Sequence, residues 1–170
     1  AADTSSPRDT LRCFLDACNE LHSLIQERQC VDRNSREHRE LARVVLDCID
    51  SSKLPAFARD QRTGEVAAAL KEVLDRVELP RWDQIPDAAE IQAAGGYEKL
   101  SRRRIPDTRI TIERVEEGPQ KHEYLFSPGS VGRAVDYYEE MEQLEYRSTG
   151  PAVSEGFYRW YTTAPGHPTI

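Results

Sequence analysis

Apolar residues recur at steps of three and four along most of the chain, which is the pattern of amphipathic helices. The first stripe runs from Leu11 to Ile25 and follows a strong start signal, with Ser6 as N-cap and Pro7 at the first helical position. The same criteria predict five helices, over residues of about 6–28, 35–50, 55–77, 87–94 and 128–143. The short polar loop between the first two favours an antiparallel helical hairpin.

The third predicted helix has two unusual positions. Gly64 falls near its middle, where glycine weakens a helix by about 1 kcal/mol relative to alanine. Phe57 is expected at the entrance of its apolar face. The later periodicity from Val66 to Val77 is regular, so the helix is predicted in spite of the glycine.

The period changes after residue 108. Ile110 and Ile112 alternate with polar residues, which predicts a strand with one buried face. Turn residues at 116–119 and a return strand ending at Phe126 complete a β-hairpin of about 108–126. Two strands alone are marginal in water, so the hairpin must pack on helices or find a third strand. The predicted fold class is α+β, mainly α: a single domain of 170 residues with a bundle of amphipathic helices and a small antiparallel hairpin.

Composition limits the classes of partner. The net charge of −7 argues against nucleic-acid binding, which needs a basic face. The longest apolar run, Val66 to Leu70, is far shorter than the roughly 20 residues of a spanning helix. The chain starts at Ala1 without an initiator Met, and residues 162–170 have the composition of a linker, here expected to lead toward a membrane segment outside this sequence.

Candidate chemistry is sparse. Cys18 and His22 are four residues apart and could meet one metal ion, but the close ligand pairs of a structural zinc site are missing. Residues 32–37 begin like a calcium loop but lack its central glycine and distal acid, and 129–132 lacks the lysine of a phosphate loop. We therefore expect no catalytic residue, no metal and no cofactor, and we do not expect an enzyme.

The four cysteines all lie in the first third of the chain. Free cysteines are usually small hydrophobes in helix interfaces, and that is the preferred interpretation of Cys13, Cys18 and Cys48. A second hypothesis is a disulfide between Cys18 and Cys48, because an antiparallel hairpin that turns near Arg33 could bring them opposite each other. A count of four free thiols on the unreduced, unfolded protein would eliminate that disulfide.

Two features suggest an interaction surface. The basic cluster at 102–104 could contact lipid headgroups or acidic groups of a partner, although surface solvation is the simpler interpretation. The aromatic segment 157–161 could cap the core or lie near a membrane interface. The candidate surface residues are Trp82, Arg102, Arg103, Arg104, Phe157 and Trp160.

Six segments of the chain, in their order, resemble one known family. The segments are 6–19, 70–77, 82–87, 110–115, 124–131 and 137–140. Together they look like the extracytoplasmic N-terminal domain that precedes the membrane helices in certain bacterial channels of the small-conductance mechanosensitive family. The order of the segments carries the resemblance, since each alone is ordinary helix or hairpin chemistry.

The resemblance implies a non-enzymatic structural or regulatory module at the membrane surface, on the periplasmic side of the inner membrane. Its implied partners are the rest of its own channel chain, sister subunits and the membrane surface, while the isolated domain is expected to be monomeric. The pore-lining helix and gate of such channels lie outside this sequence, so no functional residue is carried over.

An alternative from another class is a soluble ligand- or partner-binding module of a bacterial envelope protein. It predicts a concave apolar pocket with convergent polar groups around Trp82, Tyr124 and Trp160.

Overall fold

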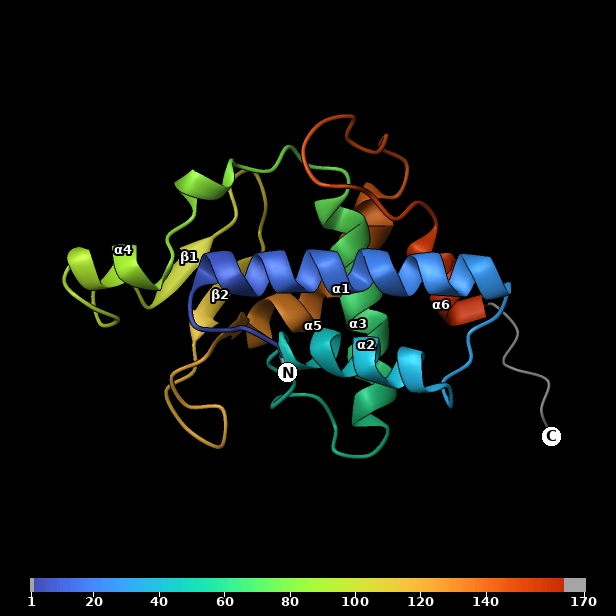
Figure 1. Cartoon of the computed structure of the whole chain (residues 1–170), viewed down its shortest axis with the longest axis horizontal. Helices are drawn as coiled ribbons and strands as arrows, with labels where there is room; N and C mark the ends of the chain where they lie inside the picture. Colours follow the sequence, from blue (N-terminus) through green and yellow to red (C-terminus); the bar gives the residue numbers. More distant parts are fainter. Residues whose placement is uncertain (1, 164–170) are drawn as a thin grey trace.

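The computed structural model describes residues 2–163 and has six α-helices beside a small antiparallel sheet (Figure 1). The predicted α+β, mainly α class is confirmed. In chain order the elements are α1 (Pro7–Arg28), α2 (Arg36–Asp47), α3 (Arg59–Leu74), the 3₁₀ turn η1 (Trp82–Gln84), α4 (Ala88–Ala93), β1 (Arg102–Arg104), β2 (Thr111–Arg114), β3 (Tyr124–Phe126), α5 (Pro128–Met141) and α6 (Phe157–Thr163).

Side-chain caps begin four of the helices where the sequence predicts helix starts. Ser6, Ser35, Asp87 and Ser127 each accept a hydrogen bond from the backbone N–H three residues later. This satisfies one of the N–H groups that have no partner inside a helix. Observed and predicted bounds of these four helices therefore agree within a few residues.

α3 is the central element of the fold. It runs behind α1 and α2 in Figure 1 and packs against α5, α6 and α2. From Val66 to Asp75 every residue is buried, so the helix has no solvated face along these turns. α1 and α2 form the predicted helical hairpin in front of it.

The predicted β-hairpin, formed by β2 and β3, is completed by a third strand, β1. The strand order is β1-β2-β3, with Arg103 opposite Ile112 and Ile112 opposite Phe126. On its other side Phe126 forms a parallel bridge with Ile49, and its ring lies 4.7 Å from that of Phe14 in α1. The sheet is thereby attached to the helices on one side and ends at β1 on the other.

Three sequence expectations differ from the structure. α3 starts at Arg59 rather than at 55, and Phe57 is 86% exposed in the preceding loop, so it does not enter the core. Gly64 is buried, and a Cβ there would lie 2.9 Å from the ring of Tyr161, so the glycine makes room for α6. Thr162 and Thr163, predicted as linker, are the last residues of α6, while 164–170 lie outside the described residues.

Candidate functional site

α3 places charged side chains in the interior of the molecule. Lys71, Glu72 and Asp75 are each at most 1% exposed. Burying a charge costs several kcal/mol unless the charge is paired and hydrogen-bonded. The hydrogen bonds and ion pairs of these three residues must therefore offset the cost of their burial.

Lys71 and Asp75 share a set of short hydrogen bonds with one distant residue. Lys71 Nζ donates to Asp75 Oδ1 at 2.5 Å and to Ser154 Oγ at 3.0 Å. The backbone N and the hydroxyl of Ser154 both donate to Asp75 Oδ2 at 2.8 Å. Arg147 approaches from the same segment, with its Nη2 3.6 Å from Asp75 Oδ1. The lysine and the carboxylate thus hold residues 147–154 against α3.

Glu72 makes a second set with the same segment. Arg76 Nη1 donates to Glu72 Oε1 at 2.9 Å, and the hydroxyl of Tyr146 donates to the same oxygen at 2.6 Å. The backbone N of Tyr158 donates to Glu72 Oε2 at 3.0 Å, at the start of α6. We call Lys71, Glu72, Asp75, Arg76, Tyr146, Arg147 and Ser154 the α3 polar network. It fastens the segment 146–158 to the centre of the fold.

Ser154, Lys71 and Asp75 are residue types that occur in nucleophilic catalysis, but their arrangement here is structural. Ser154 donates its proton to the carboxylate of Asp75, and its hydroxyl accepts from Lys71. All three side chains are completely buried. A nucleophile must reach a substrate, so the geometry serves attachment rather than attack.

The sequence contains the signal for this network, although we did not predict it. Lys71 and Asp75 are four residues apart, as are Glu72 and Arg76, which is the spacing of helical ion pairs. Such charges normally mark a solvated face. Here they continue directly from the apolar run Val66 to Leu70, which leaves no side of the helix for solvent.

The predicted interaction residues do not form one surface. β1 and α6 lie toward opposite sides of the molecule in Figure 1. Phe157 is wrong as a surface residue, because it is 2% exposed and packs its ring 5.8 Å from that of His22. Trp160 is half-buried on α6, and Trp82 is half-buried in η1 with the guanidinium of Arg12 4.7 Å from its ring centroid.

The three arginines of the basic cluster form β1, and each side chain already has a partner. Arg102 pairs with Glu113 at 3.2 Å. Arg103 donates to the carbonyl of Gln84 and Arg104 to that of Thr108, both at 3.1 Å. The cluster is therefore the edge strand of the sheet rather than a set of three unengaged cations.

The cysteines are free thiols in the structure, so the disulfide hypothesis for Cys18 and Cys48 is not borne out by it. Both residues are completely buried in the core, as the preferred interpretation expects. The side chain that hydrogen-bonds to Cys48 is Cys13, which is half-buried. This bond lowers the pKa of Cys13 to about 6, whereas burial raises the pKa of Cys18.

The histidines and acids give no metal site: within residues 2–163 no group of three His, Cys, Asp or Glu side chains could hold an ion. His22, proposed beside Cys18, lies with Nε2 2.9 Å from the carbonyl oxygen of Glu155. Burial lowers the pKa of both His22 and His38.

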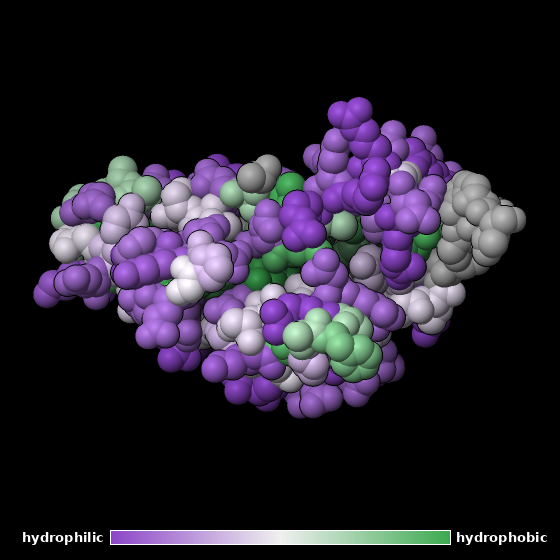
Figure 2. Space-filling model, turned by 90° about the horizontal axis from the view of Figure 1, so that it is seen from below, coloured by the Kyte–Doolittle hydropathy of each residue, from purple (hydrophilic) through white to green (hydrophobic). Residues whose placement is uncertain are grey.

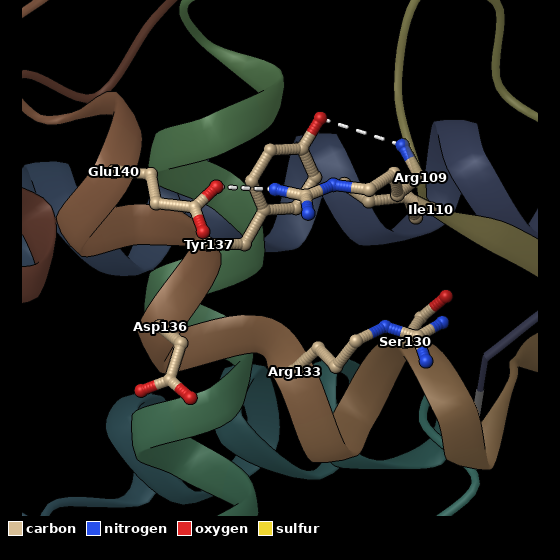
Figure 3. A pocket seen from close by; sticks show the side chains of 7 residues that line it. All are labelled: Arg109, Ile110, Ser130, Arg133, Asp136, Tyr137 and Glu140. Atoms are coloured by element: carbon tan, nitrogen blue, oxygen red, sulfur yellow. Dashed lines mark hydrogen bonds and ion pairs between the residues drawn. The ribbon is translucent and has the colours of Figure 1, made fainter.

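Among the surface cavities, one of about 160 Å³ lies between α5 and the residues just before β2 (Figure 3). Arg109 crosses it, with its guanidinium 4.3 Å from the ring centroid of Tyr137 and its charge paired with Glu140. The dashed line at the top of Figure 3 joins the hydroxyl of Tyr137 to the backbone N of Arg109, at 3.4 Å. Arg109 is thus engaged on both sides, by the ring of Tyr137 and by the carboxylate of Glu140.

Three larger cavities have volumes of about 430, 550 and 720 Å³. Trp82 lines the first of these, beside Pro80 and Pro151. Tyr124 and Trp160 line none of the four, and Tyr124 is completely buried with its hydroxyl donating to the carbonyl of Leu100. The expected pocket around Trp82, Tyr124 and Trp160 is therefore wrong, because the tyrosine is a core residue.

Apolar surface is limited on the face shown in Figure 2, where hydrophilic side chains predominate and hydrophobic ones appear in a central hollow and in smaller groups below it and at the left end. Of the large hydrophobic side chains that the structure describes, Phe57 and Leu144 are exposed. No helix in the described part of the chain has the length and apolar character to cross a membrane. Comparison of the chain with protein-family models, curated proteins and solved structures gave no match.

Proposed function

We propose that this chain is a non-catalytic extramembrane domain of a channel of the small-conductance mechanosensitive family, and that it serves as a structural or regulatory module at the membrane surface. The observation that carries the proposal is the ordered resemblance of six segments, from Ser6 to Glu140, to the N-terminal domain of such channels. Its proposed location is the periplasmic side of the inner membrane. Its proposed partners are the rest of its channel chain, sister subunits and the membrane surface.

The positions of the resembling segments support this proposal. Segment 6–19 is the cap and first half of α1, and 124–131 is β3 with the start of α5. Segment 70–77 contains four residues of the polar network, Lys71 and Glu72 in α3 and Asp75 and Arg76 directly after it. The resemblance therefore falls on residues that build the core and hold its parts together, as expected when related domains share a fold.

The α3 polar network also supports a module that transmits displacement. It attaches the segment before α6 through buried and partly buried ion pairs and hydrogen bonds, and Phe157 adds an apolar contact at the start of that helix. Breaking a buried ion pair costs about 3–5 kcal/mol. We therefore expect a displacement of α6 to move α3 with it while these ion pairs and hydrogen bonds stay intact.

The test begins with the gene that encodes this chain. The proposal expects hydrophobic spans of roughly 20 residues after Ile170. The encoded full-length protein, expressed in bacterial cells without mechanosensitive channels of their own, should give a conductance that opens under suction on a membrane patch. A gene without such spans, or a full-length membrane protein without a stretch-activated current, would overturn the proposal.

A further inference from the structure

The largest of the four cavities, about 720 Å³, lies where α2, α3 and α6 meet and is rich in arginine. Arg33, Arg39 and Arg43 line it together with His38 and Tyr161. We call it the arginine pocket. Its volume is within the range of small-ligand sites.

The pocket has a surplus of positive charge on a chain whose net charge is −7. Asp60 is the one carboxylate in its lining, and it lies 3.8 Å from Arg43, too far for a close ion pair. Asp60 is 75% exposed in its side chain and can turn to solvent. Within the described residues Arg39 has neither an ion pair nor a hydrogen bond of its side chain.

Two acids of this region act on the pocket itself: Asp47 lies 3.8 Å from Arg43, and the charge of Asp32 raises the pKa of His38 against the opposite effects of burial and Arg33. Two others are engaged elsewhere. Glu37 pairs with Arg28 at 2.8 Å and Glu40 with Arg36 at 2.9 Å. Arg33 is held in place by Tyr161, since it donates to the tyrosine carbonyl at 3.2 Å and lies 5.2 Å from the ring centroid. Arg33 is thus ordered by α6, and the lining holds three arginines against one carboxylate.

His38 is the second, independent feature of the pocket. It lies in the first turn of α2, is only 3% exposed and stacks on Tyr161 with 6.5 Å between ring centroids. Ser35 binds its backbone N, but in the described part of the chain its ring has no hydrogen-bond partner. An imidazole N–H at the wall of a cavity can donate to a ligand.

We infer that the arginine pocket binds a phosphate group, with Arg33, Arg39 and Arg43 supplying charge and His38 supplying a ring N–H. Guanidinium groups match phosphate oxygens in pairs, and the nearby first turn of α2 adds the positive end of its dipole. The phosphate can belong to a soluble phosphomonoester or to the headgroup of an anionic lipid. The inference does not depend on the proposed channel function.

The first test titrates the 170-residue chain with inorganic phosphate while the ring of His38 is followed by NMR. Bound phosphate favours the protonated imidazole, so the pKa of His38, which burial and Arg33 hold down, should rise. Arg39→Gln should weaken binding about tenfold or more, because it removes a charge-assisted hydrogen bond. Arg133→Gln, in the cavity of Figure 3, is the matched control and should leave binding unchanged.

A second arm separates the two sources of phosphate. The chain is sedimented with vesicles of phosphatidylglycerol or of phosphatidylcholine alone. Binding to the anionic vesicles that Arg39→Gln abolishes and Arg133→Gln preserves identifies a lipid headgroup, whereas His38 shifts with phosphate but no vesicle binding identifies a soluble ligand. An unperturbed His38 in millimolar phosphate together with no vesicle binding overturns the inference, as does equal weakening by both variants.

Discussion

Gly64 lies buried in α3 beside the ring of Tyr161 from α6. Helix propensity alone makes Gly64→Ala stabilising by about 1 kcal/mol. The added Cβ would overlap the tyrosine hydroxyl, however, and overpacking in a filled interface costs about 1–3 kcal/mol. We expect a net loss of stability of about 1 kcal/mol, measured by urea unfolding. In a Tyr161→Phe background the loss should shrink, and an equal loss in both backgrounds would contradict this contact.

Cys13 differs from the two buried cysteines in both access and ionisation. Its hydrogen bond with Cys48 lowers its pKa to about 6, so the thiolate is the main form at neutral pH. Burial raises the pKa of Cys18, and the bond to Cys13 together with burial raises that of Cys48. In the folded protein at pH 7, iodoacetamide should label Cys13 before Cys18 and Cys48, as read by peptide mass spectrometry.

The control for this labelling is the unfolded protein, in which the three thiols should react at similar rates. Four reactive thiols without reductant would also agree with the free cysteines of the structure. Labelling of Cys18 ahead of Cys13 in the folded chain would contradict the proposed environment of both.

At the scale of the element, Ser127 does more than an ordinary N-cap. Its hydroxyl receives the backbone N–H of Ser130 at 3.3 Å and also lies 2.6 Å from the hydroxyl of Thr111 in β2. Ser35 caps α2 by the same kind of bond, but it is half-buried and, among residues 2–163, its side chain makes no hydrogen bond to a strand. Ser127→Ala should cost about 2 kcal/mol and Ser35→Ala about 1 kcal/mol in chemical denaturation. Equal costs would mean that the link to β2 contributes nothing.

The helices with local start signals were predictable, because a capping side chain and an apolar stripe lie within a few residues of each other. β1 was not, since Arg102, Arg103 and Arg104 have no apolar alternation and become a strand only through their partners in β2. α6 was missed as a helix for a related reason. Its seven residues are too few for a periodic pattern, and its position depends on Phe157 and on contacts with α3.

Local sequence also shows the type of a candidate site residue but not its burial, which depends on residues far away in the chain. Trp82 and Trp160 stand out by type, but their exposure depends on the elements packed around them. The charges of α3 look like a solvated face because most helical charges are solvated. Their burial follows from Tyr146 and Ser154, about 80 residues later, which local spacing does not reveal.

For the whole molecule, two buried histidines predict how stability depends on pH. Burial lowers the pKa of His22 and His38 below the value of about 6.5 that they have in the unfolded chain. The unfolded state therefore binds more protons as pH falls through 6.5, and the free energy of unfolding should decrease from that pH downward. Urea unfolding at pH 7.5 and 5.5 measures the decrease. His22→Gln and His38→Gln together should reduce it, and an unchanged slope would contradict this origin.

The α3 polar network makes a prediction about which part of the molecule separates first. Asp75→Asn keeps the shape of the side chain but leaves Lys71 buried without its carboxylate, which should cost about 3–5 kcal/mol. Because Asp75 accepts hydrogen bonds from the backbone N and the hydroxyl of Ser154, hydrogen exchange should accelerate most in residues 154–163, and less in α1 and α2. Asp136→Asn, on the exposed side of α5, is the control and should change neither.

The double variant Lys71→Met/Asp75→Leu separates attachment from stability. Replacing a buried ion pair by apolar residues of similar size often restores stability, so this chain should unfold near the wild-type denaturant concentration. It lacks the acceptor for Ser154, however, and residues 154–163 should still exchange faster than in the wild type. If exchange there returned to the wild-type rate together with stability, packing alone would hold α6, and the buried charges would not be its attachment.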